Sequence, residues 1–282
     1  MEKTSTKANS KIIALFAVFM LLFSFPILNI FLKIGIEVSG GIGTLLERLT
    51  SLWYMNYILV GLVSVFYLFK MHKFYVLDVV TAIVFGVAMS LQSGFNPIIG
   101  SITVIAYYSA CCIFRKYNYE NKIFKINYRT ILNHVGCGLL VGILPAILNV
   151  LEYYIQDGYT LPPFSIDRFF SAAVRALQPG ISEEIVFRFF LYAFVLNAFK
   201  GMIPKTKFAT VLTYSLLIIP HCIMHYPTSD FATNPIGTVL NLTYMCCVFG
   251  IPAVWLLKNK SLYSAIVFHW FVDFIRFWIV AH

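Results

Sequence analysis

Apolar stretches of about 20 residues, the length that crosses a bilayer as a helix, recur along this chain. Hydrophobic residues make up 60% of its 282 residues and charged residues only 12%, against about 25% charged in soluble domains. The sequence therefore predicts an all-α fold, a polytopic transmembrane bundle of about eight helices. We place the apolar segments at 12–32, 53–69, 75–92, 98–114, 130–154, 183–199, 208–225, 236–257 and 261–280.

A net charge of +9 raises the question of nucleic-acid binding. Most lysines and arginines, however, fall on one side of a nine-crossing topology, and the opposite loops hold only Lys33, Arg48, Arg168 and Arg175. The positive-inside rule then places the N-terminus in the cytoplasm and the C-terminus outside. We expect a multi-pass protein of the cell membrane whose partners are the lipid bilayer and a membrane-associated peptide or protein substrate, with no nucleic acid.

The longest polar connection, residues 115–129, divides the chain into two parts. Residues 1–129 hold the N-terminal helices, and residues 130–282 hold nearly all the polar residues of the apolar segments. No internal repeat is visible. We expect residues 1–282 to form a single integral membrane domain, with 130–282 as its catalytic core.

The stretch "SIDRFFSAAVRALQ" carries polar residues on one helical face, at Arg168, Ser171, Arg175 and Gln178, and apolar residues on the other. This pattern is typical of an amphipathic helix in the membrane interface. A solvated charged face without a role is the alternative interpretation.

Next comes "PGISEEIVFRFF", which places charged residues in an otherwise apolar region. Pro179 and Gly180 are expected to end the preceding helix, and Ser182 is expected to cap the next one. Glu183 and Glu184 would then lie at the positive end of the helix dipole.

Arg188 follows Glu184 by four residues and so lies on the same helix face, about 40° around the helix axis from Glu184. Glu183 points about 100° away from Glu184. We expect Glu184 to pair with Arg188 and Glu183 to be free for another task. The alternative is a capped helix start with one neutralised ion pair. Ionisable residues inside membranes are usually functional.

Two later segments carry polar pairs at the same spacing of four residues: His221 with His225, and His269 with Asp273. Glu183 and His225 would lie near one membrane face, and His269 would lie ~12 Å along the last helix. All these groups thus fall in one half of the bilayer. A buried carboxylate with imidazoles can activate water and stabilise an oxyanion, so we predict hydrolysis of a peptide bond in or beside the membrane.

The stretches "EEIVFR", "HCIMH" and "HWFVD" resemble the EExxxR, FxxxH and HxxxN/D motifs of the CAAX-protease and bacteriocin-processing (CPBP or Abi) family of intramembrane endopeptidases. The resemblance covers about the last hundred residues. It implies an eight-helix fold of the glutamate type. It further implies that Glu183 and His225 activate water, that His269 and Asp273 form the oxyanion site, and that Glu184 with Arg188 gives structural support.

Two residues depart from the family pattern. His221 stands where the family usually has phenylalanine, so it either adds a polar group near the site or only fills the space. Asp273 replaces asparagine, a variant that the family allows. Because an ionised carboxylate cannot donate to an oxyanion, Asp273 must be protonated or must orient His269.

Three other function classes use similar residues. Histidines with a carboxylate can bind zinc, but the HExxH arrangement is absent because Cys222 stands at the glutamate position. The family resemblance implies a metal-free mechanism, so we predict no metal and no cofactor. A proton-coupled transporter is disfavoured by the lack of a repeated half, and a non-catalytic immunity or regulatory protein that binds a peptide or a sensor remains open. For the substrate, we favour bacteriocin or pheromone processing, or self-immunity.

Overall fold

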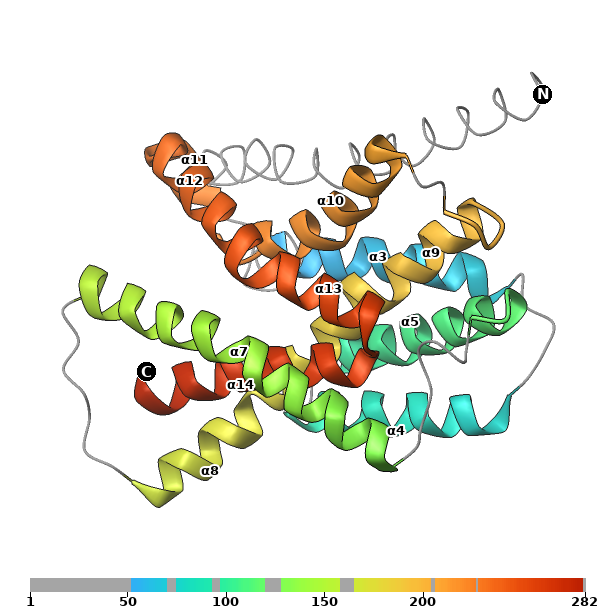
Figure 1. Ribbon diagram of the computed structural model, residues 1–282, viewed down its shortest axis with the longest axis horizontal. Helices are drawn as coiled ribbons and strands as arrows, with labels where there is room; N and C mark the ends of the chain where they lie inside the picture. The colour runs from blue at the N-terminus through green and yellow to red at the C-terminus, as the bar shows by residue number, and fades with distance from the viewer. Residues whose placement is uncertain are drawn as a thin grey trace, which may run out of the picture.

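The computed structural model describes residues 52–69, 75–92, 97–119, 128–157, 165–203, 206–226 and 228–280. Within these ranges every regular element is a helix (Figure 1). The prediction of an all-α fold is thereby confirmed. The first predicted segment, 12–32, lies outside the described residues.

The other eight apolar segments each coincide with described helices to within a few residues. Two π-helical stretches, η1 and η2, interrupt the α-helices, and the short α11 is an addition that the sequence did not predict. The elements are α3 (Leu52–Leu68), α4 (Val76–Gln92), α5 (Pro97–Lys116), α7 (Tyr128–Asp157), α8 (Ile166–Arg175), η1 (Pro179–Phe190), α9 (Leu191–Ala198), α10 (Lys207–Ile223), α11 (Thr228–Thr233), α12 (Pro235–Met245), η2 (Cys246–Gly250), α13 (Ile251–Asn259) and α14 (Leu262–Ile279).

Among the described residues, four helices are long and apolar enough to cross a membrane: Pro97–Lys116, Arg129–Ile155, Pro235–Asn259 and Leu262–Ile279. Three shorter helices, α3, α4 and α10, are also apolar. Large apolar side chains remain exposed on their outer faces, as expected for helices that contact lipid. The chain is a membrane protein, and the number and direction of its crossings remain predictions.

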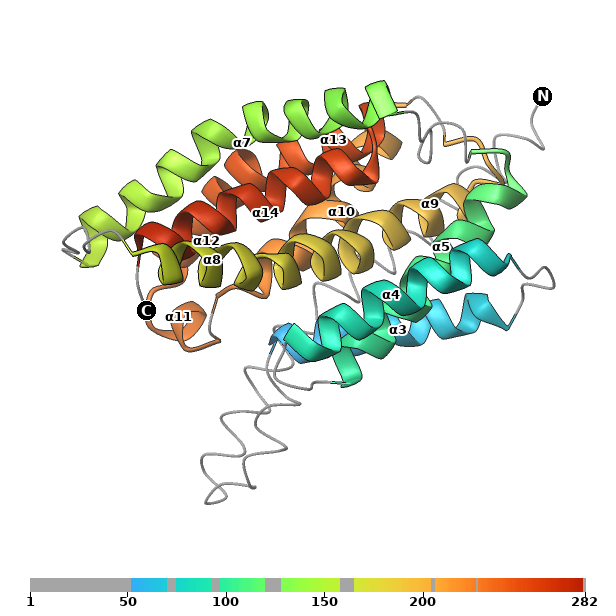
Figure 2. The ribbon, with the colours of Figure 1, turned by 90° about the horizontal axis from the view of Figure 1, so that it is seen from below.

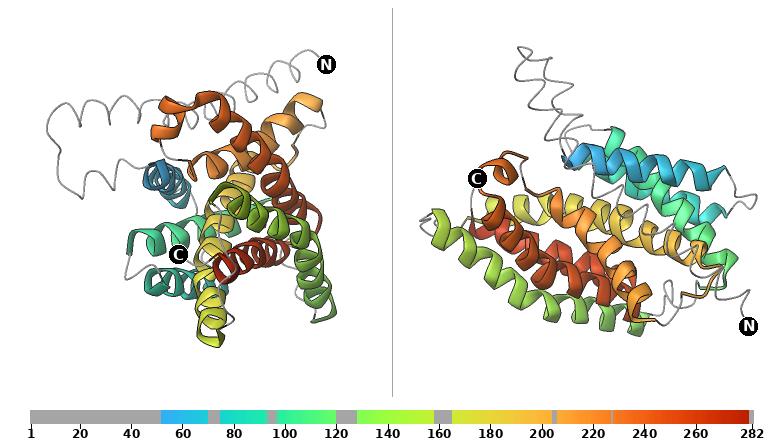
Figure 3. Two further views of the ribbon diagram at one scale, coloured as in Figure 1. Left: turned by 90° about the vertical axis from the view of Figure 1, so that its left-hand side faces the viewer. Right: turned by 90° about the horizontal axis from the view of Figure 1, so that it is seen from above.

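The segment that carries both glutamates lies in the middle of the bundle. The chain runs through α8, η1 and α9 one after another (Figures 2 and 3). The helices α7 and α14 lie on one side of this stretch, and α3, α4 and α5 lie on the other. The η1 helix contacts α3, α4, α5, α10, α13 and α14. Since all these helices surround η1, all its residues except the partly buried Ile181 are shielded from both water and lipid.

The prediction that Pro179 and Gly180 end a helix and that Ser182 caps the next one is wrong. The turn lies earlier, at Ala176, and the chain then continues as η1 from Pro179 to Phe190. Proline is tolerated in the first turn because the N–H that it lacks would have no partner there. A Cβ atom at Gly180 would lie 3.0 Å from the Cβ of Trp270, so this glycine permits close packing of η1 against α14.

The amphipathic helix predicted before the glutamates is confirmed as α8, and its apolar face packs on α14. Phe169 meets the ring of Phe274 edge to face, with ring centroids 5.0 Å apart. The indole Nε1 of Trp270 donates to the carbonyl oxygen of Ala173 at 2.8 Å. These contacts fix α8 beside the C-terminal half of α14.

Candidate active site

The π-helical winding of η1 is anchored by hydroxyl groups from the N-terminal helices. The Ser182 Oγ lies 2.9 Å from the hydroxyl of Tyr57 in α3 and 3.1 Å from Oγ1 of Thr103 in α5. All three side chains are buried. Short π-helices occur often at functional sites, and here a three-hydroxyl cluster holds one in place. Sequence analysis missed this cluster, because Tyr57 and Thr103 lie in apolar segments far from Ser182 in the sequence.

Glu184 and Arg188 pair as predicted. The Nη1 of Arg188 donates to Oε1 of Glu184, and both side chains are fully buried. The same carboxylate oxygen accepts from Nδ1 of His269 at 2.8 Å. This ion pair therefore also positions a histidine from α14.

Arg188 makes a second contact that determines how His221 is protonated. Its Nη2 lies 2.9 Å from Nδ1 of His221. A guanidinium can only donate, so this ring nitrogen accepts. In the neutral ring the hydrogen is then on Nε2, which donates to Oε2 of Glu183 at 2.7 Å. His221 is thus a polar member of the site, which settles the first of the two departures from the family pattern.

Three imidazoles surround one oxygen of Glu183. Besides His221, the Nε2 atoms of His225 and His269 lie 3.6 Å and 3.7 Å from Oε2. The Nε2 of His225 is also 3.4 Å from that of His221. The side chain of His225 is 29% exposed, whereas that of His221 is fully buried. The predicted convergence of Glu183 with histidines from two other helices is confirmed, with His221 as its nearest partner.

Asp273 lies between His269 and a further arginine. Its Oδ2 is 3.4 Å from Nε2 of His269, and its Oδ1 accepts from Nη2 of Arg276 at 2.9 Å. The arrangement favours an orienting role for Asp273, because a carboxylate paired with arginine accepts hydrogen bonds and does not donate them. Sequence analysis missed Arg276, although its spacing of three residues on the same helix was a usable signal.

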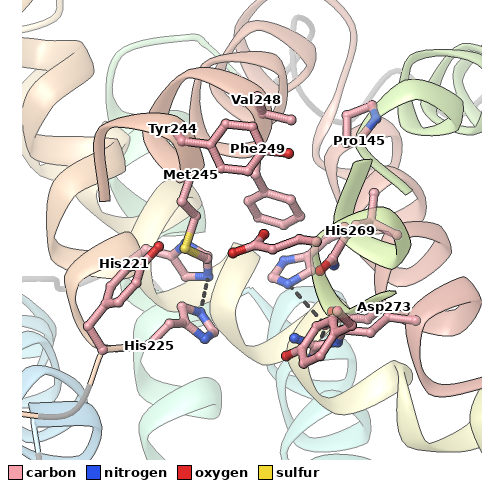
Figure 4. A pocket seen from close by; sticks show the side chains of 15 residues that line it. Pro145, His221, His225, Tyr244, Met245, Val248, Phe249, His269 and Asp273 are labelled. Carbon is pink, nitrogen blue, oxygen red and sulfur yellow. Dashed lines mark hydrogen bonds and ion pairs between the residues drawn. The ribbon is translucent and has the colours of Figure 1, made fainter. Parts of the chain in front are cut away.

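A cavity of about 230 Å³ opens onto these groups. Its wall combines the imidazoles of His221, His225 and His269 with apolar groups from α12 and η2 and with Pro145, Asn149, Glu152 and Tyr153 of α7. Glu183, in contact with His221, is not among the described wall residues. Such a mixed lining can hold a peptide backbone together with an apolar side chain. The labelled wall residues in Figure 4 are Pro145, His221, His225, Tyr244, Met245, Val248, Phe249, His269 and Asp273.

The donor atoms of Glu183, His221 and His225 all lie within 4.8 Å of one another, a geometry that could hold a metal ion. Two histidines and a carboxylate form a competent zinc set. His221 would have to offer a lone pair on Nε2 and carry its hydrogen on Nδ1. That hydrogen would face the guanidinium N–H of Arg188, 2.9 Å away. Arg188 therefore works against metal binding by His221 through Nε2.

Part of the chain matches a known protein family. Residues 165–275 match the model of the family described as type II CAAX prenyl endopeptidase Rce1-like. The match covers less than half of the chain and contains all three motifs as well as α8. It confirms the resemblance to the CAAX-protease family. No curated protein and no solved structure matched the chain.

Proposed function

We propose that this chain, whose residues 165–275 match the Rce1-like family of type II CAAX prenyl endopeptidases, hydrolyses a peptide bond of a membrane-associated peptide or protein. The family supports an intramembrane endopeptidase. The observation that carries the proposal for this chain is the cluster of three imidazoles around Oε2 of Glu183, beside a cavity in the bundle.

In the proposed reaction, Glu183 acts as the general base. It takes a proton from a water molecule, and the resulting hydroxide attacks the carbonyl carbon of the substrate. His221 holds the carboxylate through Nε2 at 2.7 Å. When the tetrahedral intermediate collapses, the proton passes from Glu183 to the leaving amine, either directly or through an imidazole. His221 is not this imidazole, because both of its ring nitrogens are engaged; it orients the carboxylate of Glu183, with its hydrogen held on Nε2 by the contact of Nδ1 with Arg188.

His269 is proposed to stabilise the oxyanion. Its Nδ1 donates to Glu184, so donation from Nε2 to the oxyanion requires a doubly protonated ring. Asp273, 3.4 Å from that Nε2, then balances the charge and orients the ring. His225 lies closest to the exposed side of the cluster and would guide water or substrate.

For the biological role, we favour bacterial processing of a bacteriocin or pheromone, or a self-immunity function, in the cell membrane. The chemistry suits each of them equally, because all require cleavage of a peptide beside the bilayer. A non-catalytic immunity or regulatory protein is the alternative: the same cavity would bind a peptide without cutting it.

A zinc peptidase is a second candidate, supported by the three convergent ligand atoms of Glu183, His221 and His225. In that case zinc would supply the Lewis acid that activates water. The contact between Arg188 and His221 favours the metal-free reaction.

The test compares peptides released by membranes that contain the wild-type chain or Glu183→Gln, a substitution of nearly equal size. We expect products that appear only with the wild type, while both proteins accumulate equally. Asp167→Asn, a change at an exposed carboxylate of α8, is the matched control and should keep full activity. Unchanged products with Glu183→Gln would favour the binding role over the enzyme.

A further inference from the structure

A second cavity, of about 170 Å³, adjoins the catalytic one. Tyr153 and Arg276 line both. The remaining wall residues of the second cavity are Arg175, Phe277 and Val280. The two cavities therefore meet at Arg276, the residue that also pairs with Asp273 in the catalytic cluster.

Among the described residues, the wall of this second cavity holds two arginines and no carboxylate, and one of these arginines, Arg276, is paired with Asp273 outside the wall. The guanidinium carbons of Arg175 and Arg276 lie 4.7 Å and 4.6 Å from the ring centroid of Phe277. Both guanidinium groups thus contact the same aromatic ring, and Asp273 balances the charge of Arg276 alone.

Both arginines have donors to spare among the described residues. The Nη2 of Arg276 donates a hydrogen bond to Asp273, but its Nε is buried and has no hydrogen-bond partner there. Arg175 forms no ion pair with the described part of the chain. The buried Nε of Arg276 is costly without an acceptor, and Arg175 is exposed, so both can donate to an acceptor that arrives with a ligand.

Arginines near the end of a membrane helix often reach outward to lipid phosphates. Arg276 instead points inward to Asp273 and lines the catalytic cavity. Arg175 is brought to the same place because α8 packs along α14 (Figure 2). The position of the pair thus favours a group on the substrate over a lipid headgroup.

We propose that Arg175 and Arg276 form a subsite that binds a carboxylate of the peptide substrate, either its C-terminal carboxylate or an acidic side chain near the scissile bond. The inference rests on the proposed function for the identity of the ligand. The subsite would select substrates and set their position relative to Glu183. Arginine suits this task because its planar fork binds a carboxylate through two parallel hydrogen bonds.

The test measures binding and so does not depend on turnover. The full chain carrying Glu183→Gln is embedded in nanodiscs of phosphatidylcholine, and three libraries of N-myristoylated peptides are offered. The first library has a free C-terminal carboxylate and no acidic side chain. The second has a C-terminal amide and one aspartate. The third has the amide and asparagine in place of aspartate. Retained peptides are identified by mass spectrometry.

We expect the first or the second library to be retained roughly tenfold better than the third, the factor for one charge-assisted hydrogen bond. Whichever carboxylate library is preferred identifies the source of the acid. The preference should disappear when Arg175→Gln is added. It should persist with Arg168→Gln, a change to another arginine of α8 that does not line the cavity.

Equal retention of the three libraries, or retention of none, would overturn the subsite. The subsite would also be overturned if phosphatidylglycerol copurified with the chain but not with Arg175→Gln, and acidic peptides were not preferred. The arginines would then form a lipid site. Failure of the proposed function looks different: acidic peptides would still bind selectively, but no cleavage product would depend on Glu183.

Discussion

Replacement of His221 by glutamine tests the central contact of the site. A glutamine side chain can keep both hydrogen bonds, since its amide nitrogen donates to Glu183 and its oxygen accepts from Arg188. Both ring nitrogens of His221 are engaged, by Glu183 and by Arg188, so His221 positions the base and does not itself carry the proton. We therefore expect His221→Gln to accumulate normally and to keep its activity to within about tenfold.

The small expected loss follows from the geometry. A positioned acid–base group contributes about 10²–10⁴-fold to a rate, whereas glutamine retains the hydrogen bond that His221 makes to Glu183 at 2.7 Å. His225 is 3.6 Å from the same oxygen, beyond ordinary hydrogen-bond reach. We expect His225→Gln to reduce the rate by less than about tenfold, since it lacks a direct bond to the base.

The assay measures the rate at which membranes form the products that depend on Glu183, with the amount of each variant determined by immunoblot. A loss of about 10²-fold or more with His221→Gln would refute the tautomer argument, because His221 would then carry a proton. A loss of that size with His225→Gln would restore His225 to the water-activating role that the family motif implies.

A second variant of His221 separates catalysis from stability. In His221→Phe, Glu183 and Arg188 each lose a buried partner, at about 1.5–3 kcal/mol for a hydrogen bond to a charged group. We expect a lower melting temperature in detergent for His221→Phe, and little change for His221→Gln.

Three further predictions concern stability and metal. Arg188→Met leaves the Glu184 carboxylate buried without its ion-pair partner and should lower the free energy of unfolding by about 3–5 kcal/mol; the double variant Arg188→Met with Glu184→Leu should recover most of it in thermal melts. Gly138→Ala would place a Cβ atom 2.6 Å from the carbonyl oxygen of Ser264 and should cost about 1–3 kcal/mol, whereas Gly136→Ala, which has open space around it, should not destabilise the protein. A zinc chelator should leave the products unchanged; activity lost to the chelator and restored by zinc would favour the metal mechanism.

Hydropathy and the local spacing of residues predicted the helical segments and one ion pair of this molecule. Segments of about 20 apolar residues must satisfy their backbone hydrogen bonds internally, so their helical state follows from sequence alone. The pairing of Glu184 with Arg188 was also predictable, because residues four apart on a helix lie on the same face.

Local rules failed where neighbouring helices decide the outcome. Pro179 and Gly180 were expected to break a helix. In the bundle, however, Ser182 is held by Tyr57 and Thr103, which are 125 and 79 residues away in sequence. No local pattern encodes such contacts, and η1 continues through the expected break.

His221 shows the same difference between what local spacing predicts and what the packing of neighbouring helices decides. Its spacing from His225 places both on one face of α10, but spacing does not fix how far the helix rotates toward its neighbours. Tertiary packing turns His221 fully inward, between Glu183 and Arg188, and leaves His225 partly exposed. The sequence by itself thus determined which helices form and which residues share a face. Only the tertiary structure decided which of those residues meet across helices, because that depends on the rotation and depth of each helix in the bundle.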